Sequence, residues 1–180
     1  IGNALWKEKI IDIFVPLPMM VSDGVELLTK LVHSFGDVGK LRIVLKPHPM
    51  TSEKVLLKAA GIRKLPAHFG FVRGKMSDWL PSVKIAIALS TSTIYEIMTF
   101  GVPVVVVGRE AAIDLNPLGF YADLNQIFFS LKQIREETLR LLSLSKSEIT
   151  KYKRRGEEVL RTAFNTVNDE TMSVFVDGIV

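Results

Sequence analysis

The sequence contains no cysteine and only three histidines. Without thiols the chain cannot form a disulfide, a thiolate metal centre or a cysteine nucleophile, and it is compatible with a reducing compartment such as the cytoplasm, where we expect it. His33, His48 and His68 lack the H-x-x-x-H and HExxH spacings of zinc sites. We therefore expect neither a metal site nor a cofactor.

Long hydrophobic runs are also missing. No apolar run, that of residues 102–107 included, approaches the ~18 apolar residues that a membrane-spanning helix needs. Residues 1–6 lack a basic flank followed by an apolar core, so they do not resemble a signal peptide. Because the first residue is Ile1 and not Met, we expect the chain to be a piece of a longer one.

What is present is typical of one well-packed domain. The chain has 180 residues, of which 48% are hydrophobic, and chains of about 100 to 200 residues usually form a single domain. The C-terminal part contains no Gly- or Pro-rich linker, so we place no boundary within residues 1–180. Internal repeats are absent as well.

Apolar, β-branched runs alternate with amphipathic stretches through the first two-thirds of the chain, which predicts an α/β fold built on a parallel sheet. The last two runs are apolar at nearly every position, as in central strands covered on both faces. Apolar spacing predicts crossover helices between the runs. The expected strands are residues 10–15, 41–46, 68–72, 84–89 and 102–107, and the expected helices 23–35, 51–60 and 93–100.

The segment after Asn125 has helical periodicity in three blocks, each opening with a capping residue. These openings are Ser130 with Gln133, Ser145 with Glu148, and Asn168 before two acidic residues. Gly101, followed by Pro103, is expected to end the preceding helix. The sequence therefore predicts a helical C-terminal tail on the α/β domain.

Charge is concentrated in one segment. Residues 40–84 hold ten basic side chains and two acidic ones, a formal +8, whereas the whole chain carries +4 and the remainder therefore −4. A focused basic region favours an anionic ligand, and a solvated Lys/Arg surface explains it about as well.

The second expected strand runs directly into Lys46-Pro47-His48-Pro49. Ligands of open parallel sheets lie beyond the carboxyl ends of the strands. Two prolines fix the backbone there and hold the imidazole in a rigid turn, from which it can donate a hydrogen bond to a phosphate oxygen, with Lys46 adding charge. The alternative is a stiff connector with an exposed histidine.

The fourth expected strand is followed by four hydroxyl residues, Ser90, Thr91, Ser92 and Thr93, at a helix start. Free N–H groups, the helix dipole and hydroxyls together form an anion site, although any helix cap also uses a hydroxyl. From the residues alone, Thr93 and Glu96 are best interpreted as a capping box.

Other phosphate and nucleic-acid motifs are missing. Residues 70–76 (GFVRGKM) are one residue short of a Walker loop and have Met in place of Ser/Thr. No G-x-G-x-x-G follows the first strand. Despite a pI of about 9.3, there is no RNP-type aromatic motif, so we expect no nucleic-acid partner.

Residues 45–49 (LKPHP) and 86–107 (AIALSTSTIYEIMTFGVPVVVV), in this order at two strand ends, resemble the C-terminal half of a GT-B glycosyltransferase. The resemblance is to bacterial surface-polysaccharide enzymes with an HP motif and a Ser/Thr motif, and it covers residues 10–107. It implies a Rossmann-like, doubly wound parallel sheet that binds a nucleotide-activated sugar or polyol. The partners it implies are a missing N-terminal acceptor-binding domain and the inner membrane as a peripheral surface.

The resemblance also implies roles for individual residues. His48 contacts a donor phosphate and is the catalytic candidate, Ser92 and Thr93 hold phosphate at the helix start, and Glu96 takes the ribose hydroxyls, which reverses the capping interpretation. The remaining implied contacts are the backbone of Phe71 and Val72 for the base, and Arg73 or Lys75 for the diphosphate.

The sequence departs from the pattern in two places. The acidic glycine motif that supplies a base in sialyltransferase-like members belongs to the N-terminal half, and we interpret Asp23 of Ser22-Asp23-Gly24 as a helix cap. The Gly-Gly turn of the nucleotide-sugar 2-epimerases, which share the architecture, is replaced by Thr91-Ser92-Thr93. Half of such an epimerase, or a non-catalytic nucleotide or polyanion-binding module, is therefore the alternative.

Overall fold

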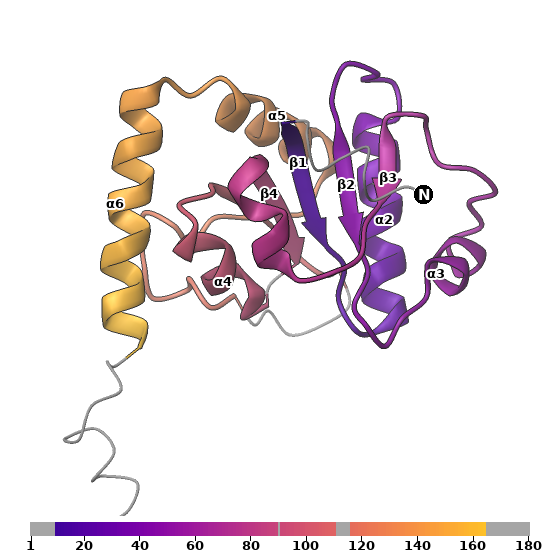
Figure 1. Ribbon diagram of the computed structural model, residues 1–180, viewed down its shortest axis with the longest axis horizontal. Coiled ribbons are helices and arrows are strands. Elements are labelled where there is room, and N and C mark those ends of the chain that lie inside the picture. Colours follow the sequence, from indigo (N-terminus) through magenta and orange to yellow (C-terminus); the bar gives the residue numbers. More distant parts are fainter. Residues whose placement is uncertain (1–9, 90, 111–115, 165–180) are drawn as a thin grey trace, which may run out of the picture.

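A computed structural model describes residues 10–89, 91–110 and 116–164. In this part of the chain six strands form one parallel sheet in the order β3-β2-β1-β4-β5-β6 (Figure 1). The expected α/β class with a doubly wound parallel sheet is confirmed. The strands are β1 (Ile11–Pro16), β2 (Ile43–Lys46), β3 (Phe69–Phe71), β4 (Val83–Leu89), β5 (Val104–Val107) and β6 (Ile127–Phe128).

Helices cover both faces of the sheet, and α6 and α3 lie at its two ends (Figure 1). Parallel sheets take this form because crossover connections place helices on the faces. The helices are α2 (Val21–Phe35), α3 (Glu53–Ala59), α4 (Thr93–Thr99), α5 (Leu131–Leu142) and α6 (Lys146–Ala163), with the short 3₁₀ turns η1 (Met76–Asp78) and η2 (Leu80–Ser82).

Alternate residues of each strand enter two separate cores. Ile13, Ile85 and Val105 pack with residues of α2, α3 and α5 on one face. Phe14 and Ala86 point to the other face and pack with α4, α6, Trp79 and Leu80. Because successive strand side chains alternate in direction, the near-continuous apolar runs that predicted these strands supply both cores at once.

The helical tail begins as predicted. Ser130 and Gln133 form a capping box at α5, and Ser145 and Glu148 form one at α6. The Ser145 hydroxyl and backbone N–H donate to the Glu148 carboxylate and lower its pKa. The third expected cap, Asn168, lies outside the described residues.

Gly101 ends α4 as expected, with a left-handed backbone (φ 67°) that suits glycine. The 51–60 helix starts later than expected, at Glu53, because the Ser52 hydroxyl accepts the Val55 N–H and caps it there. The short edge strand β6 was not predicted.

Asp23 is not a helix cap, contrary to the expectation. The cap position of α2 belongs to Met20, which makes no side-chain capping bond, and Asp23 lies within the first turn. Its carboxylate instead pairs with Arg109 at 3.1 Å, just beyond β5. Lys30, which is buried, reinforces the same connection by bonding Glu26 at 2.8 Å and the Gly108 carbonyl at 3.2 Å.

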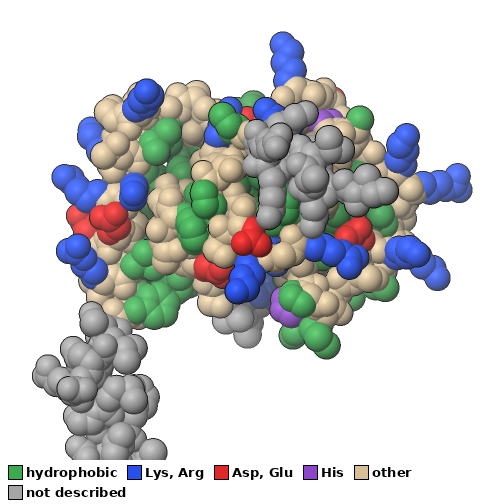
Figure 2. Space-filling model, viewed as in Figure 1, with side chains coloured by type: hydrophobic (Ala, Val, Ile, Leu, Met, Phe, Trp, Pro, Cys, Tyr) green, Lys and Arg blue, Asp and Glu red, His purple; other side chains and the backbone are tan. Residues whose placement is uncertain are grey.

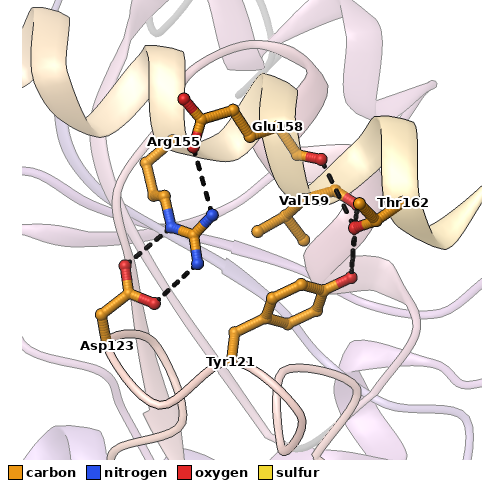
Figure 3. Close-up of polar contacts among 6 residues, drawn as sticks. All are labelled: Tyr121, Asp123, Arg155, Glu158, Val159 and Thr162. Atoms are coloured by element: carbon orange, nitrogen blue, oxygen red, sulfur yellow. Dashed lines mark hydrogen bonds and ion pairs between the residues drawn. The ribbon is translucent and has the colours of Figure 1, made fainter.

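The loop before β6 fastens α6 to the domain (Figure 3). Arg155 donates to both oxygens of Asp123, at 2.7 and 2.8 Å, and also bonds Glu158 at 3.2 Å. The Tyr121 hydroxyl lies 2.7 Å from that of Thr162. No helix in the described ranges is long and apolar enough to cross a bilayer.

The ion pair at Asp123 predicts an acid-sensitive attachment of α6. Arg155 holds the pKa of Asp123 below its usual 3.8, so the pair stabilises the fold above about pH 4 and this contribution is lost as the pH falls below that. We expect Asp123→Asn to lower the free energy of unfolding by at most about 1 kcal/mol at pH 7, the upper end for an exposed ion pair, and by less at pH 3. Urea unfolding at both pH values measures this.

The control is Glu157→Gln, which removes the charge of an exposed side chain on the same helix. It should alter the free energy of unfolding little at either pH. A deficit in Asp123→Asn that is the same at pH 3 and pH 7 would contradict the assignment.

Candidate functional site

The carboxyl ends of β1, β2 and β4 meet at one edge of the sheet. From β1 the chain passes to β2 and β3, then returns to β4 on the other side of β1, so the strand order reverses between β1 and β4. In open parallel sheets this reversal leaves a crevice at the carboxyl edge, where ligands bind. The Lys46–Pro49 turn and the hydroxyl segment before α4 follow strands on either side of β1.

The His48 ring is held in one orientation and one tautomer. The Met50 N–H donates to its Nδ1 atom at 3.2 Å, and the His48 carbonyl accepts the Thr51 N–H at 2.9 Å. Since Nδ1 is the acceptor, a neutral ring carries its proton on Nε2, which remains available as a donor. The rigid turn predicted from the two prolines therefore presents an N–H group.

A buried hydroxyl joins this turn to the neighbouring loop. Thr51 Oγ1 donates to the Met19 carbonyl, in the loop between β1 and α2, at 2.9 Å. The Leu17 N–H also donates to the Lys46 carbonyl at 2.8 Å. The loops after β1 and β2 are thus bonded to each other and hold His48 at a fixed place on the sheet edge.

His48 lies in a hollow of about 390 Å³ that also receives Arg73. The remaining lining comes from the loop that contains His48, from the start of α3 and from Gly74. Half-buried Lys46 contributes a second cation. The lining residues are Lys46, Pro47, His48, Pro49, Met50, Thr51, Ser52, Glu53, Arg73 and Gly74.

Arg73 is held at its backbone, and its side chain, which is 76% exposed, forms one ion pair. The indole Nε1 of Trp79, a buried residue, donates to the Arg73 carbonyl at 3.0 Å, and Gly74 turns the chain with a φ of 104°. Arg73 Nε bonds Glu53 Oε1 at 3.1 Å. The two Nη groups form no bond within the described residues, so they present a fork suited to a phosphate.

Three of the weaker expectations change with the structure. Val72 is fully buried and its N–H donates to Leu45 in the sheet, so only its carbonyl remains for a base. Phe71 is half-buried against the core. Lys75 is exposed and does not line the hollow, so of Arg73 and Lys75 only Arg73 joins His48 and Lys46 there.

The hydroxyl residues at positions 90–93 do not cap α4 in the way that the sequence pattern indicated. Ser90 lies outside the described residues. Ser92 is the cap residue of α4 but already has helical backbone angles, and its side chain makes no capping bond. The Thr93–Glu96 capping box that the residues alone favoured, and that the resemblance replaced by a ribose contact for Glu96, is not formed: Thr93 is the first helical residue, and the exposed Glu96 carboxylate makes no hydrogen bond within the described ranges.

Glu96 and Ser92 lie in a second hollow, of about 450 Å³, between α4 and the end of α6. Its other lining residues are Tyr95, Thr99, Leu160 and Phe164. Burial raises the pKa of Tyr95, whose hydroxyl donates to the Pro117 carbonyl at 2.8 Å. The first hollow follows β2, and the second lies on α4, the helix that follows β4 on the other side of β1.

The basic segment is only partly neutralised. Of its ten cations, Arg73 pairs with Glu53, and Lys84 pairs with Asp12 at 2.7 Å. The other eight form no ion pair in the described part of the chain. In Figure 2 Lys and Arg side chains are prominent at the right end of the face, where α3 lies, and also at the left end, where α6 lies outside this segment. This distribution is compatible with an anionic ligand and with a solvated surface.

Three residues that support the site were not predicted. Thr51, Glu53 and Trp79 act through contacts with residues that are distant in sequence or in another element. Glu53 is an acidic residue in a basic segment, which is the one sequence signal that pointed to it. No group of three or more His, Asp or Glu side chains that could hold a metal ion occurs among the described residues.

The solved structures that resemble this one include glycosyltransferases. The calicheamicin glycosyltransferase CalG4 superposes with a TM-score of 0.61 at 18% identity, covering 86% of this chain and 39% of its own. SnogD from Streptomyces nogalater gives 0.56 at 20% identity, covering 83% and 39%. The C-terminal CMP-Kdo binding domain of WaaA from Acinetobacter baumannii gives 0.60 at 13% identity, covering 89% and 94%.

The chain has the fold of a GT-B C-terminal domain. It spans about two-fifths of the length of CalG4 and SnogD, and nearly all of the WaaA domain. No protein-family model matches the sequence, and no curated protein matches it. At identities of 20% or less these structures establish the architecture, and the role of the site rests on its own geometry.

Proposed function

We propose that this chain is the donor-binding domain of a glycosyltransferase of surface polysaccharide biosynthesis, and that it binds a nucleotide-activated sugar or polyol. The observation that carries the proposal is the His48 imidazole, with Nδ1 bonded to the Met50 N–H and Nε2 left as a donor in the hollow that Arg73 enters. The hollow lies at the strand-order reversal, where parallel sheets bind ligands. The shared fold with glycosyltransferases supports the same function.

In this proposal the hollow holds the donor phosphate. His48 Nε2–H, the Arg73 fork and Lys46 donate to phosphate oxygens, and they stabilise the charge that develops when the bond to the transferred group breaks. The His48 turn is held before the ligand arrives, so little reorganisation opposes its share of this stabilisation, whereas the largely exposed Arg73 must still be ordered. His48 is the catalytic residue, and its contribution is electrostatic.

The second hollow completes the nucleotide site. Glu96 has a free carboxylate to accept the ribose hydroxyls, and Ser92 and Thr93 offer hydroxyls beside it. Thr91 and Ser90 precede them in the same segment. α4 has only seven residues, so its dipole adds little, and we assign the larger share of phosphate binding to His48 and Arg73. The Val72 carbonyl is the base contact that remains.

A WaaA domain of nearly the same extent is named for CMP-Kdo binding, which supports binding by a domain of this size without its partner. The acceptor site then belongs to an N-terminal domain, and the chain alone should bind and not turn over. A cytoplasmic location and a peripheral position at the inner membrane belong to the same proposal.

Calorimetric titration tests the proposal. CMP, CDP, UDP, GDP and ADP are titrated separately into the chain at two salt concentrations. We expect one nucleotide to bind tightly and to tolerate salt. Indifference to all five, combined with salt-sensitive binding to nucleic acid, would support a polyanion-binding module instead. Isomerisation of a free nucleotide-sugar by the full-length protein would favour the epimerase.

A further inference from the structure

The phosphate hollow contains one carboxylate, which a simple anion site does not need. Glu53, at the first position of α3, lines the hollow and bonds Arg73 Nε at 3.1 Å, with 30% of its side chain exposed. The charged groups facing the hollow are then Lys46 from β2, Glu53 from α3 and Arg73 from the loop after β3. Their formal sum is +1.

The bond to Nε places the carboxylate on one side of the guanidinium and leaves the opposite edge to the ligand. A phosphate on the two Nη groups therefore lies on the order of 6 Å from Glu53, given charge-assisted hydrogen bonds of about 2.8 Å on each side of the group. At this separation Glu53 repels every negative charge that the phosphate carries. Its effect on binding grows with the charge of the ligand.

Transfer of the sugar changes that charge. In an activated donor the phosphate that bears the sugar is substituted on both sides, by the sugar and by the nucleoside or its next phosphate, and carries one negative charge. When the bond from the sugar carbon to the phosphate oxygen breaks, the electron pair stays on the oxygen. The acceptor hydroxyl forms the new bond to carbon and releases its proton to solvent, and the freed phosphate becomes a dianion above about pH 6.

We propose that Glu53 is a specificity-determining residue that disfavours the dianionic phosphate of the product relative to the monoanionic phosphate of the donor. It does so while orienting Arg73, so the same side chain arranges the donor contact and weakens retention of the released nucleotide. The inference about product release rests on the proposed function. The charge discrimination itself depends only on the geometry of the hollow.

Glu53→Gln separates the two roles, because the amide oxygen still accepts the Arg73 Nε–H and only the charge is lost. The probes are methyl phosphate, a dianion at pH 8, and dimethyl phosphate, a monoanion, each titrated by NMR at low salt. With an effective dielectric constant of about 40, one added ligand charge at ~6 Å is worth about tenfold in affinity. We expect Glu53→Gln to raise the affinity ratio of methyl to dimethyl phosphate by about that factor.

The matched control is Glu136→Gln, which removes an exposed negative charge from α5 and should leave the ratio unchanged. An equal gain for both esters in Glu53→Gln, no change, or a ratio that shifts as much in the control would overturn the inference. So would failure of the wild-type chain to bind either ester. If the esters behave as expected while no nucleotide binds, the proposed function fails and the charge discrimination stands.

Discussion

Replacing His48 with alanine lowers nucleotide affinity by about ten- to a hundredfold, the value of a hydrogen bond to a charged group. The ring is held by the Met50 N–H, so its Nε2–H meets the phosphate without a conformational cost. The substitution removes a half-buried side chain from the rim of a hollow, so stability should change little. Calorimetric titration of the nucleotide that binds the wild-type chain, together with urea unfolding, measures both effects.

Two further variants test whether the loss of affinity comes from the missing N–H donor of His48. His48→Gln retains an N–H donor on a flexible chain and should recover part of the lost affinity. His33→Ala removes an exposed histidine on α2 and should bind like the wild type. Wild-type affinity in His48→Ala would show that the rigid turn is only a connector, which is the alternative that the sequence left open.

The largest effect on stability is expected for Trp79→Ala. The Trp79 side chain is 1% exposed and packs with Val72, Met76 and Leu80 beneath the loop that presents Arg73. Truncation of a buried Trp to Ala typically costs about 3–5 kcal/mol, a large share of the 5–15 kcal/mol that stabilises a typical domain. Urea unfolding followed by circular dichroism measures the loss.

Trp79→Phe distinguishes the packing of this residue from its hydrogen bond. The ring still fills most of the space, but the bond from Nε1 to the Arg73 carbonyl is lost. We expect a cost of about 1 kcal/mol, because a partly buried hydrogen bond is lost, and weaker binding of nucleotide through a less well held Arg73. A Phe variant that loses stability but binds nucleotide normally would show that Trp79 does not position Arg73.

The central sheet could be predicted because its strands are buried on both faces. In β4 and β5 nearly every residue is apolar, and this signal does not depend on knowing the neighbours. β6 has two half-buried residues whose pairing with β5 decides their conformation, and no local pattern distinguishes them from a loop. Local burial could be predicted, whereas pairing at the edge could not.

The candidate site likewise has a part that could be predicted from local sequence and a part that could not. The turn at His48 could be predicted because two prolines act on their own backbone. The bond between Glu53 and Arg73 joins α3 to the loop after β3, and only the folded sheet brings them together. The Thr-x-x-Glu pattern wrongly indicated a capping box at Thr93. The helix begins one residue earlier than the pattern suggests, because Ser92 already has helical backbone angles, and the residue types alone do not reveal this.

The parallel order of the sheet has a consequence for how the chain is made. β1 lies at the centre, between β2 and β4, and Ile13 is in register with Ile85, seventy-two residues later. At about 5–20 residues per second, one side of this apolar strand has no partner for roughly 4–14 s of synthesis. Aggregation during translation should therefore depend on how soon residues 83–89 leave the ribosome.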